Sequence, residues 1–114
     1  MFFAGYNGSN DINDYAWCAG TATDLKTHEV KGMATNSYDL YDMSGNVYEW
    51  CWDWNGNYAS ADVTDPLGAS GSSRVYRGGS WNLGASYCSV AYRSGASPYG
   101  RQSIVGFRVV RNAP

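Results

Sequence analysis

The segment from Asn36 to Tyr58, "NSYDLYDMSGNVYEWCWDWNGNY", constrains the fold more than any other part of this 114-residue chain. It carries three of the five tryptophans, but its apolar residues follow neither a helical period nor the alternation of a strand. A Ser44-Gly45-Asn46 sequence in the middle of the segment demands a turn. The pattern predicts a tight loop that leads into a strand whose indole rings enter the core.

The composition indicates a turn-rich fold around one modest core. A chain of this length buries only about two-thirds of its unfolded surface. Helix formers are scarce, whereas fourteen glycines and ten tyrosines favour loops held by aromatic anchors, so we expect little regular helix. The expected aromatic core residues are Trp50, Trp52, Trp54, Trp81 and Phe107.

Three further segments have the pattern of extended structure. A short extended piece is expected around Val30, within residues 26–36. "RVYRGGSW" (74–81) alternates like a strand that a glycine pair breaks, and "VGFRVVR" (105–111) indicates the last strand.

The charges divide between the two parts of the chain. All ten acidic residues precede Pro66, where two lysines leave a formal charge of −8, and the six arginines that follow give +6. Opposite charges in one small domain pair with each other or hold a metal. We expect Arg77, Arg93 and Arg108 to pair with the acidic part, buried or half-buried. The arginines are dispersed, which argues against a nucleic acid as the partner.

The three cysteines, Cys18, Cys51 and Cys88, do not form a metal motif. None belongs to a Cys-x-x-Cys pair, and the single His28 completes no zinc-ligand spacing. Cys51, between two tryptophans, is expected to be a small buried hydrophobe. No apolar run approaches the roughly 20 residues of a membrane span, so no membrane insertion is expected.

Several separated motifs together resemble one known family. They are "LYDMSGNVYEWCWDW" (40–54), "RVYRGGSW" (74–81), Arg93, Pro98 and "GFRVVR" (106–111). In this order and spacing they resemble the formylglycine-generating-enzyme, or sulfatase-modifying-factor, family. The resemblance implies an α+β, C-type-lectin-like domain with short strands, long loops and little helix. It covers only the later half of the family's domain, so residues 1–114 are expected to be one partial or minimal domain.

The resemblance also implies a structural calcium ion in the loop before the tryptophans. Its ligands would be the side chains of Asp42 and Glu49 and the main-chain carbonyls of Gly45 and Val47. Two carboxylates seven residues apart across a turn suit a hard cation that takes oxygen ligands. The alternative is that these acids pair with arginines and bind no metal.

A second implied site concerns catalysis. The family's oxidases bind copper(I) through two cysteines that follow a Gly-Gly-Ser-aromatic motif. The first cysteine lies two positions after the aromatic residue, and the second lies five positions after the first. The matching positions here are Leu83 and Cys88. Leucine supplies no sulfur for this soft ion, so neither copper nor formylglycine-generating activity is expected. Cys88 would be reactive only if Arg93 or Arg77 lowered its pKa, and the simpler interpretation is that it packs inside with Val90.

Residues 80–104 have the composition of a variable binding surface. When the apparent scaffold residues are set aside, fifteen positions remain, and all except Gln102 can be encoded by triplets that end in a pyrimidine. Adenine-directed mutagenesis of asparagine codons would leave such a set. The fifteen positions are Asn82, Leu83, Gly84, Ser86, Tyr87, Tyr92, Ser94, Gly95, Ala96, Ser97, Tyr99, Gly100, Gln102, Ser103 and Ile104.

Within the family, the chain is most similar to the variable proteins of diversity-generating retroelements, whose randomised sites lie in the matching interval. We therefore expect a non-catalytic domain that binds a macromolecular ligand, a protein or a glycan. Tyr87, Tyr92 and Tyr99 are the expected energetic anchors. The resemblance alone implies display on a cell or virion surface. The alternative function is a formylglycine-generating copper oxidase, or a degenerate relative of one, with Cys88 as its catalytic residue.

Overall fold

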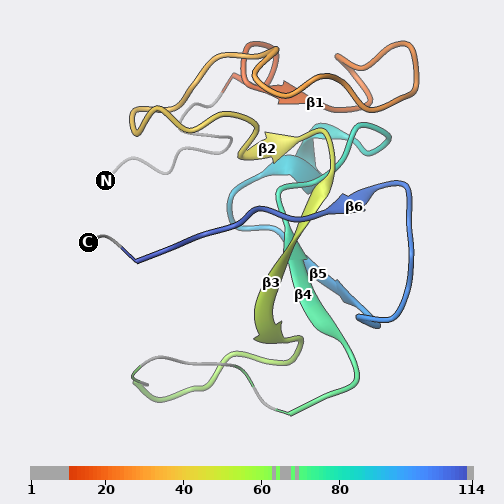
Figure 1. The fold of residues 1–114 in the computed structure, drawn as a ribbon. Coiled ribbons are helices and arrows are strands. Elements are labelled where there is room, and N and C mark those ends of the chain that lie inside the picture. Colours follow the sequence, from red (N-terminus) through yellow and green to blue (C-terminus); the bar gives the residue numbers. More distant parts are fainter. Residues whose placement is uncertain (1–10, 63, 65–67, 69, 113–114) are drawn as a thin grey trace.

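The computed structural model describes residues 11–62, 64, 68 and 70–112, which form short strands joined by long loops (Figure 1). The strands are β1 (Ala16–Trp17), β2 (Ser44–Gly45), β3 (Tyr48–Trp54), β4 (Arg74–Arg77), β5 (Arg93–Ala96) and β6 (Val105–Gly106). A 3-10 helix, η1 (Ala85–Cys88), is the one helical element of the described residues, so the expectation of little helix is confirmed. Within these residues no helix has the length and apolarity to cross a membrane.

Strand β3 lies inside a four-stranded sheet with the order β5-β4-β3-β6. Strand β4 is antiparallel to β3 and β5, whereas β6 is parallel to β3. The register between β3 and β4 shifts between Trp50 and Trp54, which bends β3. Figure 1 shows the loop that joins β3 to β4 at one end of this sheet and the β1–β2 pair beyond the other end.

The parallel pair of β1 and β2 connects the N-terminal loops to the sheet. Gly45 has a φ of +80°, and a Cβ there would lie 2.4 Å from the carbonyl oxygen of Trp17, so only glycine fits. The Gly45 N–H donates to the carbonyl of Gly78 at 2.6 Å, and the Asn46 N–H donates to that of Trp17 at 2.7 Å. The predicted turn is confirmed, and three chain segments meet at it.

The buried core is small and contains a single large aromatic residue among the part of the chain that the structure describes. Its hydrophobic members are Ala16, Cys18, Ala22, Tyr48, Val75 and Cys88. Ser44 and Ser80 are also fully buried beside the turn. Cys51, which was expected to be buried, is only half-buried.

The expectation that five aromatic residues fill the core is wrong. The exposed fractions of Trp52 and Phe107 are 73% and 79%, and the other three, Trp50, Trp54 and Trp81, are half-buried. The guanidinium of Arg74 packs over the rings of Trp52 and Trp54, at 4.7 and 3.6 Å from their centroids, which gives these indoles a cationic partner at the surface.

Two of the three extended segments differ from the prediction. Val30 lies in a turn region and is 67% exposed, and the last strand stops at Gly106 instead of Arg111. The third segment is confirmed, because β4 ends at Arg77 and Gly78 and Gly79 follow with φ values of +95° and +77°.

Among the described residues, neither Arg77 nor Arg93 forms the predicted ion pair with a carboxylate. Arg77 donates to the Tyr58 hydroxyl at 2.9 Å and to the Val90 carbonyl at 3.4 Å. Arg93 donates to the Asn55 side-chain oxygen at 3.3 Å and lies 4.1 Å from the Tyr58 ring centroid. The loop after β3 brings Tyr58 to both guanidinium groups and Asn55 to Arg93, whereas the carbonyl partner of Arg77 comes from the segment before β5.

Gly79 should be the least replaceable glycine near Cys88. A Cβ at Gly79 would lie 2.5 Å from the Cys88 sulfur and 2.8 Å from the Tyr87 carbonyl oxygen. Gly79→Ala should therefore lower the free energy of unfolding by about 3 kcal/mol, as measured by urea denaturation. Gly84→Ala is the control, since no atom lies within 4 Å of a Cβ there. Equal stability of the two variants would contradict this packing.

Candidate functional site

A single arginine closes the loop for which calcium was predicted. Arg108 donates from Nε to both carboxylate oxygens of Glu49, at 3.1 and 2.9 Å, and from Nη2 to one of them at 2.7 Å. The same Nη2 donates to the main-chain carbonyls of Tyr41 at 2.9 Å and Asp42 at 3.2 Å. Hydrogen bonding to Glu49 raises the pKa of Arg108, so the pair stays charged. The expected pairing of Arg108 with the acidic part is confirmed.

The second acid of this loop also has a protein partner. Asp42 is 9% exposed, has a φ of 56°, and accepts a hydrogen bond from the Lys31 N–H at 2.8 Å. The described residues contain no group of three or more His, Cys, Asp or Glu side chains that could hold a metal. While Arg108 occupies Glu49, the loop carboxylates do not form a ready calcium site, and calcium binding by Asp42, Gly45, Val47 and Glu49 stays a prediction.

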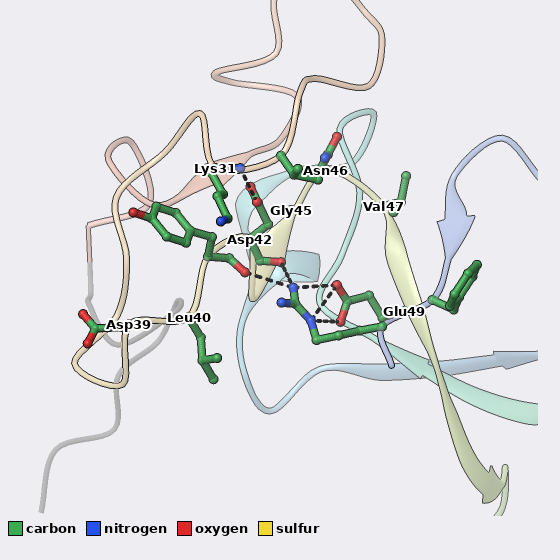
Figure 2. A pocket seen from close by; sticks show the side chains of 12 residues that line it. Lys31, Asp39, Leu40, Asp42, Gly45, Asn46, Val47 and Glu49 are labelled. Atoms are coloured by element: carbon green, nitrogen blue, oxygen red, sulfur yellow. Dashed lines mark hydrogen bonds and ion pairs between the residues drawn. The ribbon is translucent and has the colours of Figure 1, made fainter. Parts of the chain in front are cut away.

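A cleft of about 430 Å³ opens beside this loop. Figure 2 shows Asp42 and Glu49 in it with their hydrogen bonds, and Leu40 and Val47 lie around them. The cleft is lined by both polar and apolar side chains: Val30, Lys31, Asp39, Leu40, Tyr41, Asp42, Gly45, Asn46, Val47, Glu49, Phe107 and Arg108.

The sequence analysis did not predict the role of Asn46. Its side chain accepts from the His28 N–H at 3.0 Å and donates to the His28 carbonyl at 3.1 Å. Its own carbonyl accepts from the Trp81 N–H at 2.8 Å. Asn46 thus fixes the start of residues 80–104 to an N-terminal loop. The available signal was an asparagine directly after a turn glycine, since asparagine tolerates a positive φ, which is 64° here.

The fifteen predicted binding positions divide into two groups, and none of them is buried. Nine are exposed: Asn82, Gly84, Ser86, Tyr87, Ser97, Tyr99, Gly100, Gln102 and Ser103. Six are half-buried: Leu83, Tyr92, Ser94, Gly95, Ala96 and Ile104. In Figure 1 the loop that joins β5 to β6, which carries several of the exposed positions, projects away from the sheet.

Part of the half-buried group is fixed by the fold. Ser94, Gly95 and Ala96 lie in β5 and pair with β4. A Cβ at Gly95 would lie 2.7 Å from side-chain atoms of Asn55, so packing restricts this position to glycine. The surface open to exchange is therefore smaller than the sequence pattern predicts.

The three tyrosines expected as anchors differ in their surroundings. Tyr99 is 94% exposed and Tyr87 is 40% exposed. Tyr92 is half-buried, with its ring edge-on to Tyr87 at a centroid distance of 5.0 Å. Burial raises the pKa of Tyr48, and a hydrogen bond with the Tyr92 side chain adds to the effect. Tyr92 therefore joins the surface to the core, and its loss would also cost stability.

Cys88, the catalytic residue of the enzyme alternative, is inaccessible to solvent. Cys88 is fully buried, and burial, with a smaller effect of nearby Cys18, raises the pKa of its thiol to about 12. The main-chain N–H groups of Ser80 and Gly45 lower that pKa by less. Leu83 offers no second sulfur for copper. The expected contact partner Val90 is 51% exposed, so Cys88 packs instead against the backbone of Gly79.

Cys88 should be unreactive toward thiol reagents in the folded protein. With a pKa of about 12, its thiolate fraction at pH 8 is minute, and the sulfur is also inaccessible. In a variant that lacks Cys18 and Cys51, labelling at pH 8 should be at least 100-fold slower than in 8 M urea, by the rough scale of the pKa shift. The control variant retains only Cys51, which is half-buried, and should label faster. Rapid labelling of folded Cys88 would restore it as a catalytic candidate.

The Arg108–Glu49 pair should contribute measurably to stability. The two side chains are 33% and 24% exposed, and Arg108→Met would leave the Glu49 carboxylate without its partner. We expect a loss of about 2 kcal/mol in urea denaturation. Arg111→Met, at an exposed position, should change stability by less than about 0.5 kcal/mol. Equal effects of the two substitutions would contradict the role of the pair.

The motifs, the sheet and this loop agree with one protein family. The family model described as FGE-sulfatase, sulfatase-modifying factor enzyme 1-like domain, matches residues 5–113. The chain belongs to this family. It is 41% identical over 95 residues to the formylglycine-generating enzyme of Streptomyces coelicolor. The aligned region covers 78% of this chain and 30% of that protein.

Solved structures of other proteins share the fold. Treponema denticola variable protein 1 is 43% identical with a TM-score of 0.78, over 89% of this chain and 41% of that chain. PvdO from Pseudomonas aeruginosa is 28% identical with a TM-score of 0.72, over 93% and 43%. The C-type-lectin-like fold class is confirmed. This chain spans less than half the length of each relative.

Proposed function

We propose that this chain is a non-catalytic recognition domain that binds a protein or glycan through the exposed side chains of residues 82–104. The observation that carries the proposal is that none of the fifteen predicted contact positions is buried, while Ser80 and Cys88, within and beside the same segment, are completely buried. The fold therefore presents a surface made of Tyr, Ser, Asn, Gln and Gly residues.

Such side chains suit binding better than chemistry. Tyr99 and Tyr87 offer large amphipathic contact areas with few rotatable bonds, and serine and asparagine add adaptable hydrogen bonds. The frame limits the entropy lost on binding, because β5 pairs with β4 at four consecutive positions and Trp81 is hydrogen-bonded to Asn46.

The similarity to Treponema denticola variable protein 1 supports a diversified surface. In this proposal the exposed positions vary between copies of the gene, and the domain is displayed on a cell or virion surface. The genomic signature would be a near-copy of the codons for residues 77–111 beside a reverse transcriptase, differing only where the copy has adenine. A gene locus without such a copy would contradict diversification, though not binding.

The enzyme alternative has support from the similarity to formylglycine-generating enzymes, which reaches 41% identity for that of Streptomyces coelicolor. It requires chemistry at Leu83 and Cys88, where one position lacks sulfur and the other holds a buried neutral thiol. Incubation of the chain with copper(I) and a cysteine-containing sulfatase peptide should yield no formylglycine by mass spectrometry. Turnover that a Cys88→Ser change abolishes would replace our proposal with the enzyme.

Binding capacity should reside in the exposed part of residues 82–104. We expect a displayed library randomised at the nine exposed positions to yield ligands for purified hen lysozyme with a Kd of about 1 µM or lower. In a selected binder that retains both tyrosines, replacing Tyr87 and Tyr99 by serine should weaken binding at least about tenfold. Tyr38→Ser is the matched control, because Tyr38 is 81% exposed outside this segment.

A second library tests whether this location matters. It is randomised at nine exposed positions between residues 19 and 39, and it should yield no binder of comparable affinity. Equal success of the two libraries, or loss of binding in Tyr38→Ser, would contradict the assignment of the surface.

A further inference from the structure

Strand β5 (Arg93–Ala96) belongs to the proposed binding segment and is the last strand on one side of the sheet. It follows the order β5-β4-β3-β6 and pairs with β4 at four consecutive positions without a register shift. In the part of the chain that the structure describes, no strand pairs with its other side. Figure 1 shows β5 beside β4, just before the loop that projects away from the sheet. We call the unpaired side the outer edge of β5.

The hydrogen bonds of β4 determine which main-chain groups of β5 point to this edge. The Asn55 N–H donates to the Ser73 carbonyl at 2.8 Å, so Ser73 directs its main-chain groups toward β3. These directions alternate along a strand. Arg74 and Tyr76 therefore direct their N–H and carbonyl groups toward β5.

Two residues of β5 consequently direct their main-chain groups outward. Ser94 and Ala96 are the register partners of Tyr76 and Arg74, so their N–H and carbonyl groups bond to β4. Those of Arg93 and Gly95 then point to the outer edge. Among the described residues, no main-chain hydrogen bond satisfies them there. Two donors and two acceptors are thus available to another extended chain.

The side chains of β5 do not obstruct its outer edge. After Arg93 the strand contains only serine, glycine and alanine. It has no lysine, proline or bulge, the features that commonly protect an edge strand. The guanidinium group of Arg93 is turned to the Asn55 amide and the Tyr58 ring. A second backbone can therefore approach β5 closely.

The charge of the binding segment indicates an acidic partner. Residues 82–104 contain Arg93 and Arg101 but no Asp or Glu. Within the described residues, neither of these arginines pairs with a carboxylate. Arg93 also lies opposite Arg77 in the register of β4 and β5, and like charges so placed repel each other. An acidic side chain on an added strand would offset this repulsion.

The main-chain pattern and the charge together define the kind of ligand. We propose that the ligand is a protein that adds an extended, acidic segment as a strand along the outer edge of β5. The outward groups of Arg93 and Gly95 pair with the backbone of this segment, and an acidic side chain lies opposite Arg93. The inference rests on the proposed function and narrows it, because a glycan has no peptide backbone to continue the sheet.

Linear peptides are the probe that tests strand addition. Peptides of about ten residues, the upper length of a typical strand, are displayed on phage and selected on the immobilised full chain. The tightest binder should carry Asp or Glu. In amide exchange measured by nuclear magnetic resonance, it should slow exchange at Arg93 and Gly95 at least about tenfold, because both amides gain a partner. The amides of Ser94 and Ala96, already bonded to β4, should change less.

Methylation of the peptide's own amides supplies the matched control. Every second N–H of an added strand bonds to β5, and the others point away from it. N-methylation of one alternate set should weaken binding at least about tenfold, whereas methylation of the other set should leave the Kd nearly unchanged. Replacing the acidic side chain opposite Arg93 by its amide should weaken binding about threefold.

Several results would overturn the proposal: no enriched peptide, equal binding of the two methylated sets, or protection at β6 instead of β5. A chain that dimerises and protects Gly95 without peptide would assign the edge to a second copy, which also overturns it. Failure here is distinguishable from failure of the proposed function. A lysozyme binder that depends on Tyr87 and Tyr99 supports recognition by this surface even when the peptides fail.

Discussion

The turn at Gly45 and Asn46 is the constraint on which the rest of the structure depends. Through main-chain bonds it holds Trp17, Gly78 and Trp81, and through its amide side chain it holds the backbone of His28. The left-handed φ values of 80° and 64° direct the hydrogen-bonding groups of the turn toward these partners. Because the core is so small, buried hydrogen bonds at this turn hold together chain segments that hydrophobic packing would hold together in a larger domain.

This arrangement is compatible with the proposed function, in which a rigid frame and an exchangeable surface share one segment. Residues 80–104 are fixed at Ser80 and Cys88, which are fully buried, and along β5. Between these points the exposed side chains, such as those of Asn82 and Tyr87, face water, whereas Tyr92 is half-buried and joins the surface to the core. The buried, neutral Cys88 thiol belongs to the frame, so the position that resembles a catalytic cysteine serves packing here.

Local patterns in the sequence predicted the turn, the break after β4, the scarcity of helix and the pairing of Arg108 with the acidic part. They wrongly predicted burial of Trp52 and Phe107, because an apolar residue is buried only where another element of the fold packs over it. In the part of the chain that the structure describes, Arg77 and Arg93 contact a main-chain carbonyl and Tyr58 instead of carboxylates, and no charge pattern in the sequence indicates such partners. Gly95 was included among the variable positions because Asn55, which packs against it, lies far from it in the sequence.

The stability of the frame should not depend on the identity of the exposed surface residues. The most direct measurement is urea denaturation of a variant in which the exposed non-serine positions become serine together: Asn82, Gly84, Tyr87, Tyr99, Gly100 and Gln102. The account predicts cooperative unfolding with a loss of no more than about 2 kcal/mol, since exposed substitutions cost little each. Loss of cooperative unfolding would show that these side chains hold the fold together and would contradict the account.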